Sequence, residues 1–408
     1  MRVCFVSRRY WPAVSGMSVY AENLLRELVA LGHEVVLVSQ YRDDEAGTRV
    51  YGGGPPPAQR VPDGVEVVAL PSRGETLDPA DFEADIAALV ETVGRLHSEQ
   101  PFDILHAQYG YPPGLAVLQA SRSTGVPTVV SIQGGDGHWV GTCCSTHKAA
   151  ITTVLDHAGA VLIGSDSFRD EVVGHHGTDP GRFNIVPGAT DTQLFSPGLR
   201  SLGAVQDPPV LLFHGRIDRR KGVLDLLDAC DLLVDGGRDL RLLVSGIGPD
   251  LDVVRARGGK HVELTGYTDP ADAPDVYRRA DVFVSPTYSE GFSNTILEAM
   301  ATGLPVVSTD SVGVVDCLRH GDNGLLHQPG DVAGLVQLLN TVLDDADLRT
   351  RLARTALEQV RRLYTWPVLA RSIDEVYRSL IGTAPDLDWS LPEGVDRSCR
   401  FRAAPHLL

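Results

Sequence analysis

Two short segments in the second half of the chain combine residue types that suit the binding of a sugar diphosphate. The first, 213–222, carries Arg216 and Lys221 between a strand-like stretch and a helix-like stretch. Cations beside the amides of a helix N-terminus can neutralise the charge of a departing nucleotide. Taken alone, this segment is equally compatible with a solvated basic turn.

The second segment, 285–298, also begins where a strand is expected to end, and it opens a helix. Glu290 falls in its loop and Glu298 within the helix. Carboxylates accept hydrogen bonds from sugar hydroxyls, so Glu290 suits a hexose and Glu298 a ribose. The alternative is a capped helix with two surface glutamates. The backbone N–H groups expected at the helix start, suited to a phosphate or a capping side chain, belong to Gly291, Phe292, Ser293 and Asn294.

Strand-like and helix-like periods alternate along both halves of the chain, which is typical of doubly wound α/β domains with parallel sheets. A Pro- and Gly-containing stretch at 197–209 suits a linker between two such domains. Such sheets bind ligands at the carboxyl ends of their strands, so two domains facing each other would share a central cleft. Strands are expected at 3–7, 34–39, 65–70, 103–107, 127–132, 160–163 and 183–186, then at 210–214, 240–245, 261–265, 281–285 and 305–308.

The composition indicates an ordinary globular protein of two domains. The chain has 408 residues, of which 43% are apolar and 22% charged, and a net charge of -17. This acidity argues against nucleic-acid binding and strong membrane association. The apolar runs are far shorter than the roughly 20 residues that span a bilayer. No secretory signal is evident, so a cytoplasmic protein is expected. The oligomeric state stays open.

The six cysteines show no disulfide framework and no paired metal-ligand spacing. Adjacent Cys143 and Cys144, with His147, could bind a metal or react. From the sequence we interpret these cysteines as ordinary thiols that are packed or exposed. Asp-x-Asp triplets at 250–252, 345–347 and 386–388 fit solvated faces, and no metal is expected.

The glycine-arginine loop ending in Lys221, together with Glu290 and Glu298, resembles the family-4 retaining glycosyltransferases of the GT-B fold. The resemblance implies an acceptor-binding domain at 1–195 and a sugar-nucleotide-binding domain at 196–364. It also implies a helix at 365–381 that crosses back to the first domain, followed by a tail at 382–408. Supporting motifs lie at 15–16, 103–108, 186–195, 246–249, 266–267 and 298–305.

The resemblance also implies roles for individual residues. Arg216 and Lys221 would hold the diphosphate, Glu290 with the amides of 291–293 the donor sugar, and Glu298 the ribose. Stabilising the leaving charge would then be the main catalytic task, without a dedicated nucleophile and with retention at the anomeric carbon. The resemblance also implies that the backbone at Gly16 approaches the donor phosphate and that Gly246 and Gly248 border the nucleotide base.

One loop departs from the family pattern. Many relatives have a histidine beside the reacting sugar where this chain has Gln133. Gln133 could hydrogen-bond a hydroxyl instead, while Asp136 or His138 in the same loop could act as a base or anchor the acceptor. His106 could face the same region, or it could be a structural histidine with its hydrogen bonds satisfied.

We therefore expect an enzyme of hexosyltransferase type that moves a sugar from a UDP- or GDP-sugar to an acceptor hydroxyl without a metal. The acidic first domain favours a small soluble acceptor, neutral or cationic. One alternative is a nucleotide-sugar epimerase of the same fold. A second is a non-catalytic nucleotide-sugar-binding protein, although an intact set of cations and carboxylates disfavours it.

Overall fold

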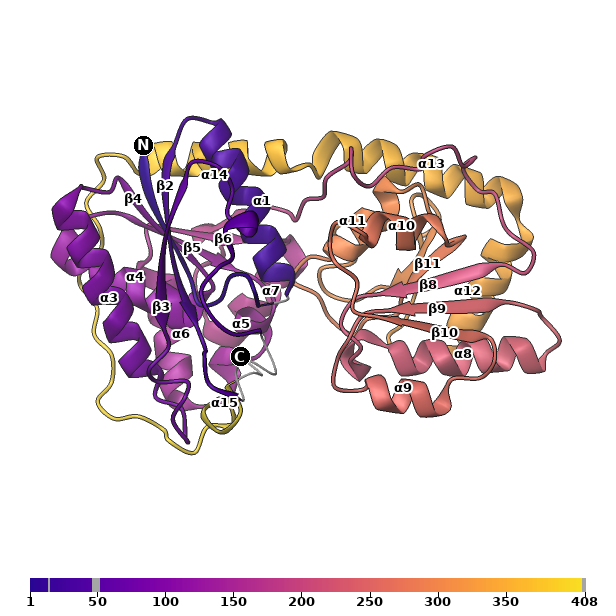
Figure 1. Ribbon diagram of the computed structural model, residues 1–408, viewed down its shortest axis with the longest axis horizontal. Helices are drawn as coiled ribbons and strands as arrows, with labels where there is room; N and C mark the ends of the chain where they lie inside the picture. The colour runs from indigo at the N-terminus through magenta and orange to yellow at the C-terminus, as the bar shows by residue number, and fades with distance from the viewer. Residues whose placement is uncertain (14, 46–51, 406–408) are drawn as a thin grey trace. The chain divides into compact units, whose positions relative to one another are not determined.

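The computed structural model describes residues 1–13, 15–45 and 52–405, which form two compact units (Figure 1). Unit 1 comprises Met1–Val186 and Leu369–Leu408, and unit 2 comprises Pro187–Val368. The chain enters unit 2 at Pro187 rather than at 196. The reason is that Phe195 is buried in the core of unit 2, where its ring lies 5.6 Å from that of Tyr277.

Unit 1 is built on a seven-stranded parallel sheet in the order β3-β2-β1-β4-β5-β6-β7. Its central strands are apolar runs such as Val3–Val6. Both faces of the sheet are covered, so side chains on either side of these strands are buried. The strands are β1 (Arg2–Ser7), β2 (Glu34–Tyr41), β3 (Val65–Pro71), β4 (Ile104–Gln108), β5 (Thr128–Ile132), β6 (Ala160–Ile163) and β7 (Phe183–Ile185). The main helices are α1 (Gly16–Ala30), α3 (Phe82–Glu99), α4 (Leu115–Thr124), α5 (Gly135–His138), α6 (Ser145–His157), α7 (Asp166–His176) and α14 (Trp366–Leu380).

Unit 2 repeats this architecture with six parallel strands in the order β10-β9-β8-β11-β12-β13. The two parallel sheets confirm the expected doubly wound α/β class. The strands are β8 (Val210–His214), β9 (Arg241–Ser245), β10 (Val262–Gly266), β11 (Val282–Ser285), β12 (Val306–Thr309) and β13 (Leu325–His327). The helices are α8 (Val223–Asp235), α9 (Leu251–Arg257), α10 (Ala273–Arg278), α11 (Asn294–Ala301), α12 (Val332–Asp344) and α13 (Ala346–Leu363).

In each sheet the first three strands are added toward one edge, and the later strands are added toward the other edge. In unit 1 this change of direction falls between the neighbours β1 and β4, and in unit 2 between β8 and β11. The loops at the carboxyl ends of such a strand pair diverge to opposite faces and leave room for a ligand. These two places are therefore where the topology favours binding.

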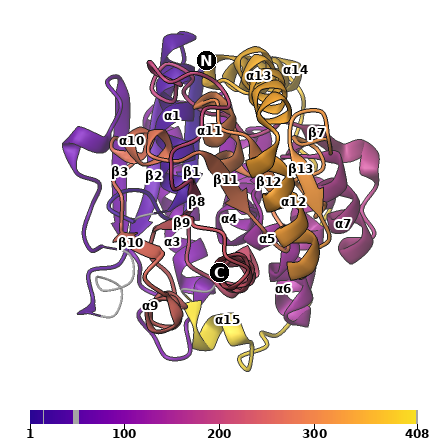
Figure 2. The ribbon, with the colours of Figure 1, turned by 90° about the vertical axis from the view of Figure 1, so that its right-hand side faces the viewer.

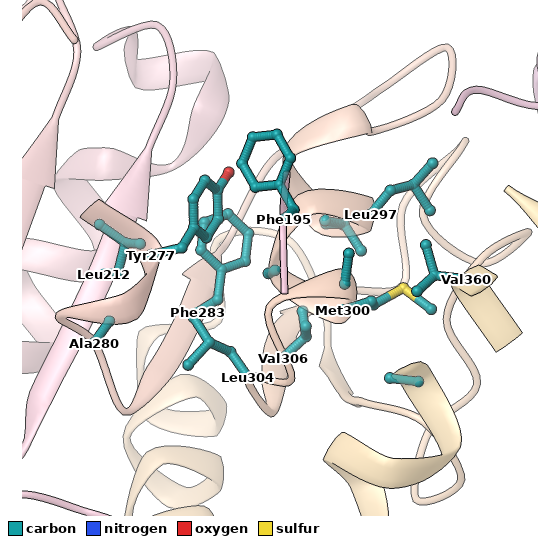
Figure 3. Packing of buried hydrophobic residues seen from close by; sticks show 14 of the residues in the cluster. Phe195, Leu212, Tyr277, Ala280, Phe283, Leu297, Met300, Leu304, Val306 and Val360 are labelled. Atoms are coloured by element: carbon teal, nitrogen blue, oxygen red, sulfur yellow. The ribbon is translucent and has the colours of Figure 1, made fainter. Parts of the chain in front are cut away.

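Helix α11 is held in unit 2 by its apolar face (Figure 3). Leu297 and Met300 are fully buried among Phe283, Val306 and Val360. Burial of large apolar side chains stabilises a fold by roughly 1.5–3 kcal/mol each. This packing fixes the direction of α11, and with it the position of every polar residue along the helix.

From Leu369 onward, helix α14 and the tail belong to unit 1. Tyr377 of α14 is fully buried, and its hydroxyl lies 2.5 Å from Nδ1 of His106 in β4. Beyond α14 the tail runs along unit 1 to the short helix α15 (Arg400–Ala403), which both views place below α6 (Figures 1 and 2). Arg402 of α15 forms a 2.6 Å ion pair with Glu83. Among the described helices, none combines the length and apolarity needed to cross a bilayer.

Candidate active site

The loop after β8 is a basic turn with several ion pairs. Asp218 accepts a hydrogen bond from the Arg220 backbone N–H at 3.0 Å and pairs with its guanidinium at 2.6 Å. Arg219 pairs with Asp250 at 2.6 Å. Gly222 has a φ of 71°, and a Cβ there would lie 1.9 Å from the carbonyl oxygen of Pro286. The loop after β8 is thus pressed against the loop after β11.

Lys221 and Glu290 meet across these two loops. The Nζ of Lys221 lies 2.7 Å from Oε2 of Glu290, and both side chains are partly exposed. Arg216 lies in the same loop as Lys221; its side chain is 49% exposed, and its Nε lies 3.6 Å from Asp218. Two cations and a carboxylate are therefore gathered at the carboxyl ends of β8 and β11, where the sheet of unit 2 changes direction.

The loop that carries Glu290 leads into the N-terminus of α11. The Glu290 N–H donates to the carbonyl of Val312 at 3.0 Å. Ser293 is the N-cap of α11, and its own side chain makes no capping hydrogen bond. A helix N-terminus of this kind can bind a phosphate through its first amides. Phe292 points inward, with its ring 5.5 Å from that of Tyr364, so its side chain anchors the loop.

Glu298 lies one turn further along α11. Its Oε2 accepts a 2.7 Å hydrogen bond from the hydroxyl of Tyr277 in α10. Burial raises the pKa of Glu298 to about 7, and the hydrogen bond from Tyr277 opposes this only in part. The carboxyl group is thus held in place, and a pKa of about 7 means that it loses its proton near neutral pH.

Gly246 and Gly248 follow β9 and pack against the backbone of the basic turn. A Cβ on Gly246 would lie 1.8 Å from the carbonyl oxygen of Gly215, and one on Gly248 would lie 2.2 Å from that of Ile217. No side chain can be accommodated at these positions without moving the turn. Close backbone packing therefore requires glycine at both positions.

In unit 1, Gln133 belongs to a hydrogen-bonded network at the sheet's change of direction. The Nε2 of Gln108 donates to Oε1 of Gln133 at 3.1 Å, and Oε1 of Gln108 accepts from the Ser7 hydroxyl at 3.0 Å. Tyr20 of α1 also hydrogen-bonds Gln133. Gly16 at the start of α1 is exposed, and a Cβ there would have no atom within 4 Å, so a ligand could approach its backbone.

Two other predicted residues, Asp136 and His138, lie inside unit 1. Asp136 is fully buried and accepts from the N–H groups of Gly110 and Gln133 at 2.7 and 2.8 Å. Burial raises the pKa of Asp136 to about 6, although these hydrogen bonds oppose the shift. His138 is 5% exposed and lies 2.7 Å from Glu171. These contacts shape the loop around Gln133.

His106 lies within β4 and is fully buried. Its ring nitrogens contact the hydroxyls of Tyr377 and Ser131 at 2.5 and 2.8 Å. Burial lowers the pKa of His106 to about 3. Because both ring nitrogens have hydrogen-bond partners in the core, the structural role that the sequence left open for His106 is favoured.

A pocket that the sequence did not indicate opens at the carboxyl ends of β1, β2 and β3. Its lining includes Arg8, Arg9, Arg42 and Glu75. Glu75 pairs with Arg8 at 2.5 Å and with Arg9 at 2.7 Å. Burial acts to raise the pKa of Glu75, but the two guanidinium groups outweigh it and lower that pKa to about 2. Glu75 lies far from both arginines in the sequence, so no local motif could reveal the pairing.

Comparison with known proteins agrees with this arrangement. Residues 15–189 match the family described as glycosyl transferase 4-like domain, and residues 208–345 match glycosyl transferases group 1. The chain is 30% identical over 405 residues to D-inositol 3-phosphate glycosyltransferase 2 of Catenulispora acidiphila, covering 89% of each chain.

Two solved structures show the same fold. Sucrose-phosphate synthase of Thermosynechococcus elongatus matches with a TM-score of 0.76 and 21% identity, over 94% of this chain and 100% of that one. Anabaena HepE in complex with UDP-glucose matches with a TM-score of 0.71 and 17% identity, over 93% and 100%.

The fold and the matches together define a nucleotide-sugar-dependent glycosyltransferase. The chain belongs to the family-4 retaining glycosyltransferases of the GT-B fold.

Proposed function

We propose that unit 2 binds a UDP- or GDP-sugar and that the sugar passes, with retention, to a hydroxyl of a small acceptor held by unit 1. The observation that carries this proposal is the 2.7 Å pair of Lys221 and Glu290 at the sheet's change of direction. It joins a cation suited to the diphosphate with a carboxylate suited to the sugar. The N-terminus of α11 beside them adds a second anion-binding element.

In the proposed reaction the bond between the anomeric carbon and the diphosphate oxygen breaks as the acceptor oxygen bonds to that carbon from the same face, and the hydroxyl proton passes to the departing diphosphate. Arg216, Lys221 and the first amides of α11 stabilise the departing negative charge. Since these groups supply the positive charge, no metal is required, and omission of Mg²⁺ and Mn²⁺ should leave turnover unchanged. Gln133, held by Gln108 and Tyr20, would hydrogen-bond a sugar hydroxyl.

For the donor, Glu298 would accept hydrogen bonds from the ribose, while Gly246 and Gly248 would border the base. The complex of HepE with UDP-glucose supports uridine as the first nucleotide to test.

For the acceptor, the pocket of Arg8, Arg9, Arg42 and Glu75 is the supporting feature. Net acidity led us to expect a neutral or cationic acceptor, but the three guanidinium groups outnumber the carboxylates of Glu75 and of Asp44, the partner of Arg42, and this excess favours an anionic group. We therefore propose a small polyol phosphate. The name of the D-inositol 3-phosphate glycosyltransferase relative is consistent with this class.

Thermal unfolding with UDP, GDP, ADP and their sugars tests the donor site, because a ligand that binds only the folded state raises its apparent stability. We expect one nucleotide family to raise the midpoint. Lys221→Ala should lower the affinity for that nucleotide about 10- to 100-fold. Lys260→Ala is the matched control, since Lys260 is an exposed lysine elsewhere in unit 2. Equal binding by wild type and Lys221→Ala would remove the diphosphate role.

Incubation with the identified sugar nucleotide tests the reaction itself. Inositol, inositol phosphate, free hexoses and short glucans are offered separately, and products are resolved by mass spectrometry. Transfer to the phosphorylated polyol supports the proposed acceptor, whereas transfer only to neutral sugars rejects it. Interconversion of the donor sugar without acceptor would indicate an epimerase. Binding without either reaction would indicate a non-catalytic protein.

A further inference from the structure

Three thiols and one imidazole from distant parts of the sequence converge inside unit 1. Cys143 and Cys144 precede α6, His147 lies in its first turn, and Cys399 comes from the tail. Their four ligand atoms all lie within 4.8 Å of one another. The sequence showed the first three residues, but Cys399 is 252 positions from His147 and was not associated with them.

The distances among these atoms are close to those around a single tetrahedral zinc ion. Nδ1 of His147 lies 3.1 Å from the sulfur of Cys143 and 3.4 Å from those of Cys144 and Cys399. The sulfurs of Cys143 and Cys144 are 3.9 Å apart. A tetrahedral Zn²⁺ bonded to sulfur at about 2.3 Å and to nitrogen at about 2.0–2.1 Å separates two sulfurs by about 3.8 Å and sulfur from nitrogen by about 3.6 Å.

The surroundings suit a closed structural site. His147 is fully buried and Cys399 is 4% exposed. The His147 backbone N–H points to the sulfur of Cys144, the N-cap of α6, at 3.4 Å. Both this N–H and the helix N-terminus stabilise a thiolate. The Tyr111 ring packs edge-on against the imidazole at 4.6 Å and helps to fix its orientation.

We propose that Cys143, Cys144, Cys399 and Nδ1 of His147 bind one Zn²⁺, which fastens the tail to unit 1. Three thiolates and one imidazole form a donor set that favours zinc over Mg²⁺ or Ca²⁺. Binding releases the thiol protons to solvent and involves no redox change. The ion is structural and distinct from the transfer chemistry of unit 2. It also holds the end of the segment Val140–Thr142, which continues from the loop of Asp136 and His138.

Metal analysis of the full-length protein, purified without chelators, tests the proposal. We expect about one zinc per chain in wild type and below about a tenth of one in Cys399→Ser. Cys399→His should retain zinc, because imidazole can replace thiolate in a tetrahedral site. Cys230→Ala is the control; Cys230 is buried in α8 of unit 2, outside the cluster, and its loss should leave the zinc content unchanged.

A second measurement follows the tail directly. Arg397 and Arg400 flank Cys399 and are exposed, so trypsin reports on local opening there. Cleavage at these sites should be about tenfold faster or more in Cys399→Ser than in wild type, with the circular dichroism spectrum unchanged. Three results would overturn the proposal: wild type that contains no zinc and takes up none from added Zn²⁺, a disulfide among the three cysteines in mass spectra, or full zinc content in Cys399→Ser.

Discussion

Glu298 shows how a single residue in this protein depends on neighbours from other elements. Its carboxyl group lies on α11, and the hydroxyl that holds it belongs to Tyr277 on α10. The sequence predicted that a carboxylate would occur within this helix. It did not predict the tyrosine or the burial that raises the pKa to about 7. The protonation of Glu298 therefore follows from packing and not from the motif.

Glu298→Gln should change how stability depends on pH. Between about pH 4.5 and pH 7 the folded chain binds a proton at Glu298 that the unfolded chain releases, so this group's contribution to the free energy of unfolding falls as pH rises through that window. Glutamine removes the contribution. Urea unfolding at about pH 5 and pH 8 should therefore show the variant gaining stability relative to wild type as pH rises.

Glu358→Gln provides the control for this experiment. Glu358 is exposed on the neighbouring helix α13. Its replacement removes one exposed carboxylate from the same region and gives the reference for the comparison. A pH-independent difference between Glu298→Gln and wild type would show that Glu298 ionises in the folded protein as it does in the unfolded chain.

At the scale of elements, the position of Glu290 depends on a loop that follows a different strand. After β12 the chain passes Val312 and Gly313, and the carbonyl of Val312 accepts the Glu290 N–H. Gly313 has a φ of 76°, and a Cβ there would lie 2.2 Å from the carbonyl oxygen of Glu290. The close contact between these two loops sets where the carboxylate of Glu290 can reach.

Gly313→Ala should therefore displace the Glu290 loop. We expect kcat/KM for the sugar nucleotide to fall about 10- to 100-fold, since small displacements in an active site are costly. Gly321→Ala is a matched control with a φ of 78° and no atom within 4 Å of the added methyl group. Both variants carry the left-handed strain of about 1 kcal/mol. Equal kinetics for the two would mean that the contact with Glu290 does not matter.

At the scale of the whole molecule, the two units differ in how the chain builds them. Unit 2 is one continuous segment with apolar clusters on both sides of its sheet. Unit 1 needs the end of the chain, because α14 covers His106 and the tail reaches Glu83. Unit 2 therefore has what an independent domain requires, whereas unit 1 also needs residues 369–405 from after unit 2 in the chain.

A fragment of residues 187–368 should consequently fold alone. We expect cooperative urea unfolding and the same nucleotide preference as the full chain, but no transfer, since the acceptor unit is missing. Lys221→Ala in the fragment should abolish the nucleotide response. A fragment that stays unfolded would show that unit 2 needs contacts from the rest of the chain.

The sequence by itself determined the class of fold and the two loops of unit 2. Apolar runs of strand length alternate with amphipathic helices, and this pattern depends on neighbouring residues. The same is true of Lys221 and Glu290, which stand at expected strand ends. Among the strands of the described residues the exception is β13, whose three residues are too few to give a pattern.

The tertiary structure alone decided which distant groups meet. Glu75 joins Arg8, Tyr377 joins His106, Tyr277 joins Glu298 and Cys399 joins His147. Burial then changed the chemistry of several of these groups by removing them from water. Local periodicity carries no information about such pairings, because they arise when packed elements bring together residues that are far apart along the chain.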